Sequence, residues 1–175
     1  EKRGTIDQKN IDLVMSLVSS NIYSNNIGSI VREIISNCYD ANKENNSSEP
    51  IKIYYENDYE NNTRYIVFED NGKGLSPELM DEVYMCMFSS TKRDDNLAHG
   101  GWGLGSKTPF SYVNQFNLVT ICNNIKYEYL LYKESIGFKY TCLSSNETLE
   151  NSGTKIKIEV DQKDLYKFNQ EFKYQ

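Results

Sequence analysis

Three groups of residues in this sequence are of types that could do chemistry. Residues 99–110 hold four glycines within six positions, followed by Lys107 and two hydroxyl side chains. Glycine lets the backbone approach another group closely, and backbone N–H groups, a helix start and a cation together favour phosphate binding. Upstream, Glu33, Asn37 and Asp40 recur at helical spacing. A carboxylate there suits a general base, and an amide oxygen is a ligand for Mg²⁺. A solvated helix face is the simpler interpretation of this trio.

A third group follows a strand-like run, where Asp70, Gly72 and Gly74 form a turn. An EF-hand calcium loop needs oxygen ligands at its third and fifth positions, which are glycines here. The alternative is one wall of a pocket for a flat heterocycle, whose exocyclic amino group would donate to Asp70. An ordinary surface turn would have the same composition.

The glycine-rich stretch narrowly misses the P-loop pattern, because Ser106 stands where the lysine should be. The Rossmann order of glycines is absent as well. The remaining pattern, G-x-x-G-x-G after the polar segment 88–99, predicts a phosphate cradle on a movable lid. A glycine-rich hairpin is the purely structural alternative. His99 lacks partners for a metal site, and Trp102 is expected to pack against the lid.

The elements that must position these groups are predicted from periodicity. An apolar arc over residues 29–45, with Ser29 as the N-cap, predicts the principal helix, and Glu33, Asn37 and Asp40 border this arc. Glu33 has no basic residue three or four positions away, so no local ion pair of that spacing explains it. Further helices are expected over residues 11–20, 76–87, 107–114 and 161–174. Strands are expected over residues 51–56, 64–69, 116–122, 126–133, 138–143 and 154–160, with the last four as an antiparallel meander.

These elements, with helices and motifs first and an antiparallel meander last, predict an α/β two-layer sandwich. A length of 175 residues suits one domain, and a net charge of −6 argues against a broad contact with nucleic acid. Four separated cysteines without a C-x-x-C pair predict free thiols in a reducing compartment. No apolar run is long enough to span a membrane, and the expected location is the cytoplasm.

In their fixed order, these motifs resemble the GHKL superfamily, which comprises DNA gyrase B subunits, the large heat-shock chaperone, histidine kinases and MutL. The resemblance covers residues 11–160 and rests on the segment 32–41, the 70–74 turn, the glycines of 100–105, and Gly153-Thr154. It implies the Bergerat fold, in which helices pack on one face of a mixed, largely antiparallel sheet and ATP is held between helices and sheet. Within the superfamily, residues 89–92 and 100–112 look most like phage rapid-lysis RIIA-like proteins.

The resemblance also implies roles. Glu33 would be the general base that orients water, Asn37 would ligate Mg²⁺, and Asp40 would support the pocket. Asp70 would accept from the adenine amino group, helped by Thr154 through water, while Gly72 and Gly74 would give the base room. The remaining contacts would be to phosphates, from Gly100, Gly101, Trp102, Gly103, Leu104, Gly105, Ser106, Lys107 and, with less support, Lys92.

The expected function is therefore Mg²⁺-dependent binding and slow hydrolysis of ATP, which would close the lid and drive a homodimer or a neighbouring domain to rearrange. The alternative is a nucleotide-sensing module that binds ATP or ADP without turnover. A histidine kinase fits less well, because no phospho-acceptor histidine segment is present. The chain is expected to be a single ATP-binding domain, residues 1–175, from the N-terminal part of a longer protein.

Overall fold

The chain is organised around a six-stranded sheet, and the computed structural model describes residues 25–85, 105–134 and 138–174. The strands are β1 (Lys52–Asp58), β2 (Thr63–Glu69), β3 (Gln115–Cys122), β4 (Ile125–Lys133), β5 (Phe138–Glu147) and β6 (Gly153–Glu159). All six predicted strands are confirmed. The largest difference is at β5, which ends four residues later than predicted.

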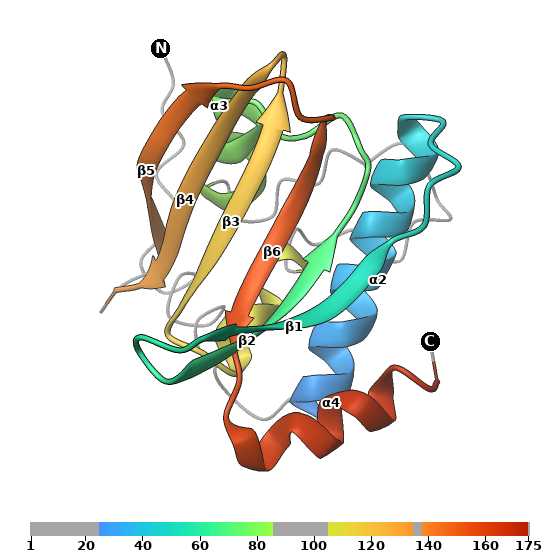
Figure 1. Ribbon diagram of the computed structural model, residues 1–175, viewed down its shortest axis with the longest axis vertical. Helices are drawn as coiled ribbons and strands as arrows, with labels where there is room; N and C mark the ends of the chain where they lie inside the picture. Colours follow the sequence, from blue (N-terminus) through green and yellow to red (C-terminus); the bar gives the residue numbers. More distant parts are fainter. Residues whose placement is uncertain (1–24, 86–104, 135–137, 175) are drawn as a thin grey trace, which may run out of the picture.

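The spatial order of the strands is β1-β2-β6-β3-β4-β5 (Figure 1). The predicted four-strand meander is wrong in one respect, because β6 does not pair with β5 and lies between β2 and β3 instead. This central position buries Ile156 and Ile158, which lie opposite Phe68 and Ile66 of β2. Every pairing in the described part of the chain is antiparallel, so the sheet there is not mixed as predicted.

The principal helix, α2, runs from Asn26 to Glu44. Its N-cap is Asn25, whose side-chain oxygen accepts a hydrogen bond from the Gly28 N–H at 2.9 Å. The prediction that Ser29 is the N-cap is wrong, because Ser29 lies inside the helix and is buried. An asparagine side chain performs the same capping function as a serine, so residue type alone does not decide between Asn25 and Ser29.

The shorter helices are α3 (Pro77–Met80), the π-helix η1 (Asp81–Met85), the 3₁₀ helices η2 (Gly105–Ser111) and η3 (Gln162–Asp164), and α4 (Leu165–Glu171). The helix predicted over 107–114 is therefore a 3₁₀ helix that starts two residues earlier. It contains Pro109, which has no N–H to donate to an α-helical hydrogen bond. The helices predicted over 76–87 and 161–174 are confirmed within the described residues.

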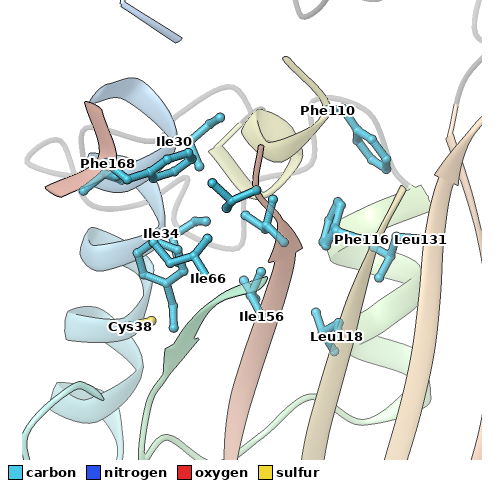
Figure 2. Close-up of a cluster of buried hydrophobic side chains, with 14 of the residues drawn as sticks. Ile30, Ile34, Cys38, Ile66, Phe110, Phe116, Leu118, Leu131, Ile156 and Phe168 are labelled. Atoms are coloured by element: carbon cyan, nitrogen blue, oxygen red, sulfur yellow. The ribbon is translucent and has the colours of Figure 1, made fainter. Parts of the chain in front are cut away.

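One hydrophobic core joins the two layers, as predicted for a two-layer sandwich. Figure 2 shows Ile30 and Ile34 of α2 facing Ile66 and Ile156 of the sheet. Alternate residues of the strands point to this face, as the period of two in a strand requires. Phe168 of α4 and one buried residue each of η2 and α3 join the same cluster, so these helices pack on the same face of the sheet as α2.

The segments predicted as an N-terminal arm, a helix over 11–20 and a polar loop over 88–99 lie outside the described residues. Among the residues that the structure does describe, no helix is long and apolar enough to cross a membrane.

Candidate nucleotide-binding site

The middle of α2 brings two of the predicted site residues together with the end of the glycine-rich stretch. Gly105, the first residue of η2, lies so close to Glu33 that a Cβ on this glycine would come within 2.8 Å of Glu33 Oε2. The same position is 3.9 Å from Asn37 Nδ2. Glu33, Asn37 and Gly105 therefore form one group, as the sequence predicts.

Glu33 has one local ion-pair contact that the helical spacing did not indicate. Arg32 Nε lies 4.0 Å from Glu33 Oε1, at the limit of an ion pair. Residues one apart do not share a helix face, and the Arg32 side chain is 57% exposed. This contact leaves Glu33 Oε2 directed toward Gly105.

The carboxylate of Asp70 forms the second part of the site. Asp70 is buried, and its Oδ1 accepts hydrogen bonds from the backbone N–H of Gly72 at 2.9 Å and of Thr154 at 3.0 Å. Its own N–H donates to the Thr154 carbonyl at 2.9 Å. Among the described residues, both bonds that the side chain accepts end on Oδ1, which leaves Oδ2 for a ligand that donates.

Burial has electrostatic consequences here. Desolvation raises the pKa of Asp70, while the hydrogen bonds from Gly72 and Thr154 oppose the shift. Cys38 on α2 faces this carboxylate, and burial together with the charge of Asp70 raises the pKa of the thiol to about 12. The Cys38 thiol therefore stays neutral.

Three glycines let the chain close tightly around Asp70. A Cβ on Gly72 would come within 2.8 Å of the Ala41 side chain, and one on Gly153 within 2.3 Å of the Asp70 carbonyl oxygen. Gly74 has φ +73°, and its Cβ would lie 2.0 Å from the Ile121 carbonyl oxygen on β3. Contacts between protein segments therefore require glycine at these three positions. This requirement is independent of any space that Gly72 and Gly74 provide for a base.

Asn42, near the end of α2, holds the turn that carries Asp70. Its Oδ1 accepts from the Asn71 N–H at 2.6 Å, and its Nδ2 donates to the Glu49 carbonyl at 2.9 Å. Asn45 Nδ2 donates to the Asn71 carbonyl at 2.8 Å. The sequence analysis missed Asn42. It lies four residues after Cys38 on the apolar arc, and this buried position for an amide was the available signal.

Lys107 does not point freely toward solvent as a phosphate-binding cation would. Its side chain is buried, and Nζ donates to the Val83 carbonyl oxygen at 2.8 Å. The neighbouring Ser106 hydroxyl is 3.5 Å from the same carbonyl. Lys107 therefore joins η2 to η1, and contact with a phosphate would require its ammonium to turn.

The two parts of the site lie along one helix. Ala41, which contacts the Asp70 turn, is eight residues from Glu33, and a rise of 1.5 Å per residue places them ~12 Å apart along the axis. Asp40 lies in between and is half-buried. A single ligand that contacts both Asp70 and Glu33 must therefore be elongated, with a hydrogen-bond donor at one end.

Two hollows in the described residues do not include the Glu33 end of the site. One, of about 190 Å³, is on the opposite face of the sheet, where Val119, Ile121 and Lys155 line it together with Asp70. The other, of about 320 Å³, lies between the start of α2 and α4. Neither is lined by Glu33 or Asn37.

The donor set around Asn37 fits Mg²⁺. Mg²⁺ takes few protein ligands and several phosphate or water oxygens, and the Asn37 amide with the nearby Glu33 carboxylate meets that requirement. Among the described residues, no cluster of three or more histidine, cysteine or acidic side chains could hold a metal alone. The predicted contacts from Lys92 and from Gly100, Gly101, Trp102, Gly103 and Leu104 lie outside the described residues.

Comparisons with known proteins show the family and the fold of this chain. Residues 23–161 match the family described as "Histidine kinase-, DNA gyrase B-, and HSP90-like ATPase". Among solved structures, the fold is similar to the ATPase region of Saccharomyces cerevisiae topoisomerase II bound to ICRF-187 (dexrazoxane), with a TM-score of 0.62 and 19% identity. A second structure of that region has a TM-score of 0.61 and 18% identity. No curated protein matches the chain.

The family match covers most of the chain, which therefore belongs to the histidine kinase-, DNA gyrase B- and HSP90-like ATPases, the GHKL superfamily. The sandwich of helices on an antiparallel sheet is consistent with the Bergerat fold of that superfamily. Each topoisomerase match covers 82% of this chain but only 43% of the yeast one, so the chain spans less than half the length of these structures. Membership of the family implies ATP binding.

Proposed function

We propose that this domain binds ATP with Mg²⁺ and hydrolyses it slowly, with adenine at Asp70 and the terminal phosphate near Glu33. The observation that carries the proposal is that the two carboxylate oxygens of Asp70 have different roles. Two backbone N–H groups hold Oδ1, and Oδ2 is left to accept from an amino group. A ligand that covers Oδ2 without donating to it would leave this oxygen unpaired, so the site favours a ligand with a donor.

The spacing along α2 supports the orientation of the nucleotide. With the base at Asp70, the triphosphate extends along the helix toward Asn37 and Glu33. The Asn37 amide oxygen would ligate Mg²⁺, which offsets phosphate charge when it is bound. Asp40 lies between the two ends and would support the pocket, and Gly105 with Ser106 would provide backbone contacts to the phosphates.

Glu33 is proposed as the general base. Its Oε2 would accept a proton from the water that attacks the terminal phosphorus, while the bond from phosphorus to the bridging oxygen breaks and ADP leaves. Phosphoryl transfer of this kind needs positioning and charge stabilisation more than covalent chemistry from the protein. Lys107 is the candidate cation, once its ammonium leaves the Val83 carbonyl.

The consequence of turnover is proposed to be conformational. Gly105 links the glycine-rich stretch to Glu33, so closure of that stretch over the phosphates would move a segment already in contact with the general base. Lid closure of this kind would favour a homodimer or a rearrangement of a neighbouring domain. A role similar to that of RIIA-like proteins and a cytoplasmic location remain predictions from the sequence.

Replacement of the general base tests the proposal. Glu33→Gln keeps the size of the side chain but cannot take a proton, so we expect phosphate release to fall by about 100-fold or more, while ATP affinity changes only a few-fold. Glu44→Gln, an exposed change at the end of the same helix, is the matched control and should leave both unchanged.

The two measurements are phosphate release with and without Mg²⁺, and calorimetric titration with ATP. If Glu33→Gln still binds ATP and releases phosphate at the wild-type rate, Glu33 is not the general base. If the wild-type domain binds ATP but releases no phosphate with Mg²⁺ present, it is a nucleotide-sensing module and not an ATPase.

A further inference from the structure

A buried hydroxyl on β3 joins the segments that surround Asp70. Thr120 has no exposed surface, and its Oγ1 accepts a hydrogen bond from the Leu75 N–H at 2.7 Å. The same oxygen lies 3.2 Å from the Gly153 carbonyl, to which it donates. The Thr154 hydroxyl is 3.4 Å away. One side chain thus joins β3 to the end of the 70–75 turn and to the start of β6.

The number of protons on these hydroxyls determines which of Thr120 and Thr154 is the donor in the contact between them. A threonine hydroxyl has one proton, and Thr120 uses its proton on the Gly153 carbonyl. Toward Thr154 it is therefore an acceptor. The Thr154 hydroxyl can donate to Thr120, while the Thr154 backbone N–H donates to Asp70 Oδ1 at 3.0 Å. Thr120 therefore positions Thr154, whose backbone N–H donates to the Asp70 carboxylate.

The backbone around Thr120 shows that the turn is held close to β3 at this point. Gly74 has φ +73°, and a Cβ there would lie 2.0 Å from the Ile121 carbonyl and 3.1 Å from Thr120 Oγ1. Only a glycine permits this approach, which brings the next residue, Leu75, within hydrogen-bond distance of Thr120.

We propose that Thr120 is a positioning residue for recognition of the purine amino group, acting through Thr154 and the 70–75 turn to hold the Asp70 carboxylate in place. This inference rests on the proposed function, since it assigns the base to Asp70. It predicts that Thr120 affects the preference for a base with an amino group more than it affects binding of the triphosphate.

The test uses Thr120→Val, which keeps the shape of the side chain and removes the hydroxyl, with Thr120→Ser as the variant that restores it. Calorimetric affinities are compared for ATP and for the triphosphate of unsubstituted purine, which lacks the amino group. We expect Thr120→Val to bind ATP about 10-fold more weakly, with a smaller loss for the analogue, because the unpaired Leu75 N–H and Gly153 carbonyl loosen the Asp70 turn. Thr120→Ser should keep the wild-type preference to within about 3-fold.

Amide hydrogen exchange of Leu75 without nucleotide provides a readout that is independent of binding. It should be faster in Thr120→Val than in the wild type and unchanged in Thr120→Ser. An unchanged ratio of the two affinities in Thr120→Val, a lost preference in Thr120→Ser, or unchanged Leu75 exchange in Thr120→Val each overturns the inference. If the wild type binds neither triphosphate, the proposed function fails, and the inferred role in base recognition fails with it. The exchange result then decides only whether Thr120 holds the turn.

Discussion

At the scale of single residues, the two carboxylate oxygens of Asp70 have different roles in this site. Its Oδ1 is part of the fold, because it accepts from Gly72 and Thr154. Its Oδ2 has no such partner among the described residues and is the atom proposed to recognise the ligand. One carboxylate therefore serves both structure and binding, and a substitution that preserves the first role can remove the second.

The raised pKa of Asp70 predicts a measurable pH dependence of stability. Burial raises this pKa in the folded state, so the unfolded state ionises first as the pH increases. The contribution of Asp70 to stability is therefore greatest below its unfolded pKa and is lost as the pH rises through its folded pKa. Asp70→Asn cannot ionise and should not show this loss.

Urea unfolding of the wild type and of Asp70→Asn, at a series of pH values from 3 to 7, measures the effect. The free energy of unfolding of Asp70→Asn minus that of the wild type should increase with pH and then become constant. A difference that decreases as the pH rises would mean that the folded state favours the ionised carboxylate instead.

At the residue scale, the sequence predicted the groups that come together but not the ones that hold them. Glu33, Asn37 and Asp70 could be chosen because their types suit chemistry and their spacing suits a helix or a turn. Asn42 and Thr120 were missed because a single amide or hydroxyl has no sequence pattern. Their importance arises from hydrogen bonds to segments about 29 and 33 to 45 positions away in the chain.

Elements carry these residues into place, and α2 contributes to both parts of the site. Its central turns carry Glu33 and Asn37, and its last turns contact the Asp70 turn through Ala41 and Asn42. The long apolar arc of α2 packs against the sheet and fixes the helix in place. One rigid helix would therefore position both ends of a bound ligand.

Loss of the Asn42 amide tests the connection between α2 and the Asp70 turn. Asn42→Ala leaves the Asn71 N–H and the Glu49 carbonyl without their partner, so we expect the free energy of unfolding to fall by about 1–3 kcal/mol. Lys43→Ala, an exposed change one position along, should stay within about 0.5 kcal/mol of the wild type. Urea unfolding measures both, and equal stability of the two variants would show that the amide contributes nothing.

The elements themselves were predictable to within a few residues, because the periods of 3.6 and 2 mark a helix and a strand directly. The pairing of β6 was not. Its short connection from β5 favoured a meander, whereas the burial of Ile156 and Ile158 is achieved between β2 and β3. The choice between these positions depends on packing across the whole sheet, which local periodicity does not contain.

At the scale of the whole molecule, one antiparallel sheet packs against α2 so that Glu33 and Ala41, which contacts the Asp70 turn, lie ~12 Å apart along the helix axis. Membership of the GHKL superfamily implies that the domain binds ATP, and this arrangement is the site that we propose for it. The chain spans less than half of the topoisomerase structures that it resembles.

Calorimetric titration of the wild-type domain and of Asp70→Asn with ATP tests the central claim most directly. In the variant, the amide oxygen replaces Oδ1 as the acceptor for Gly72 and Thr154, which preserves the turn and places a donor where Oδ2 was. The account predicts that the wild type binds ATP and that the folded variant binds it at least about 100-fold more weakly, since two donors would then face each other. Equal affinity of the two proteins for ATP would contradict the account, because it would show that Asp70 does not recognise the base.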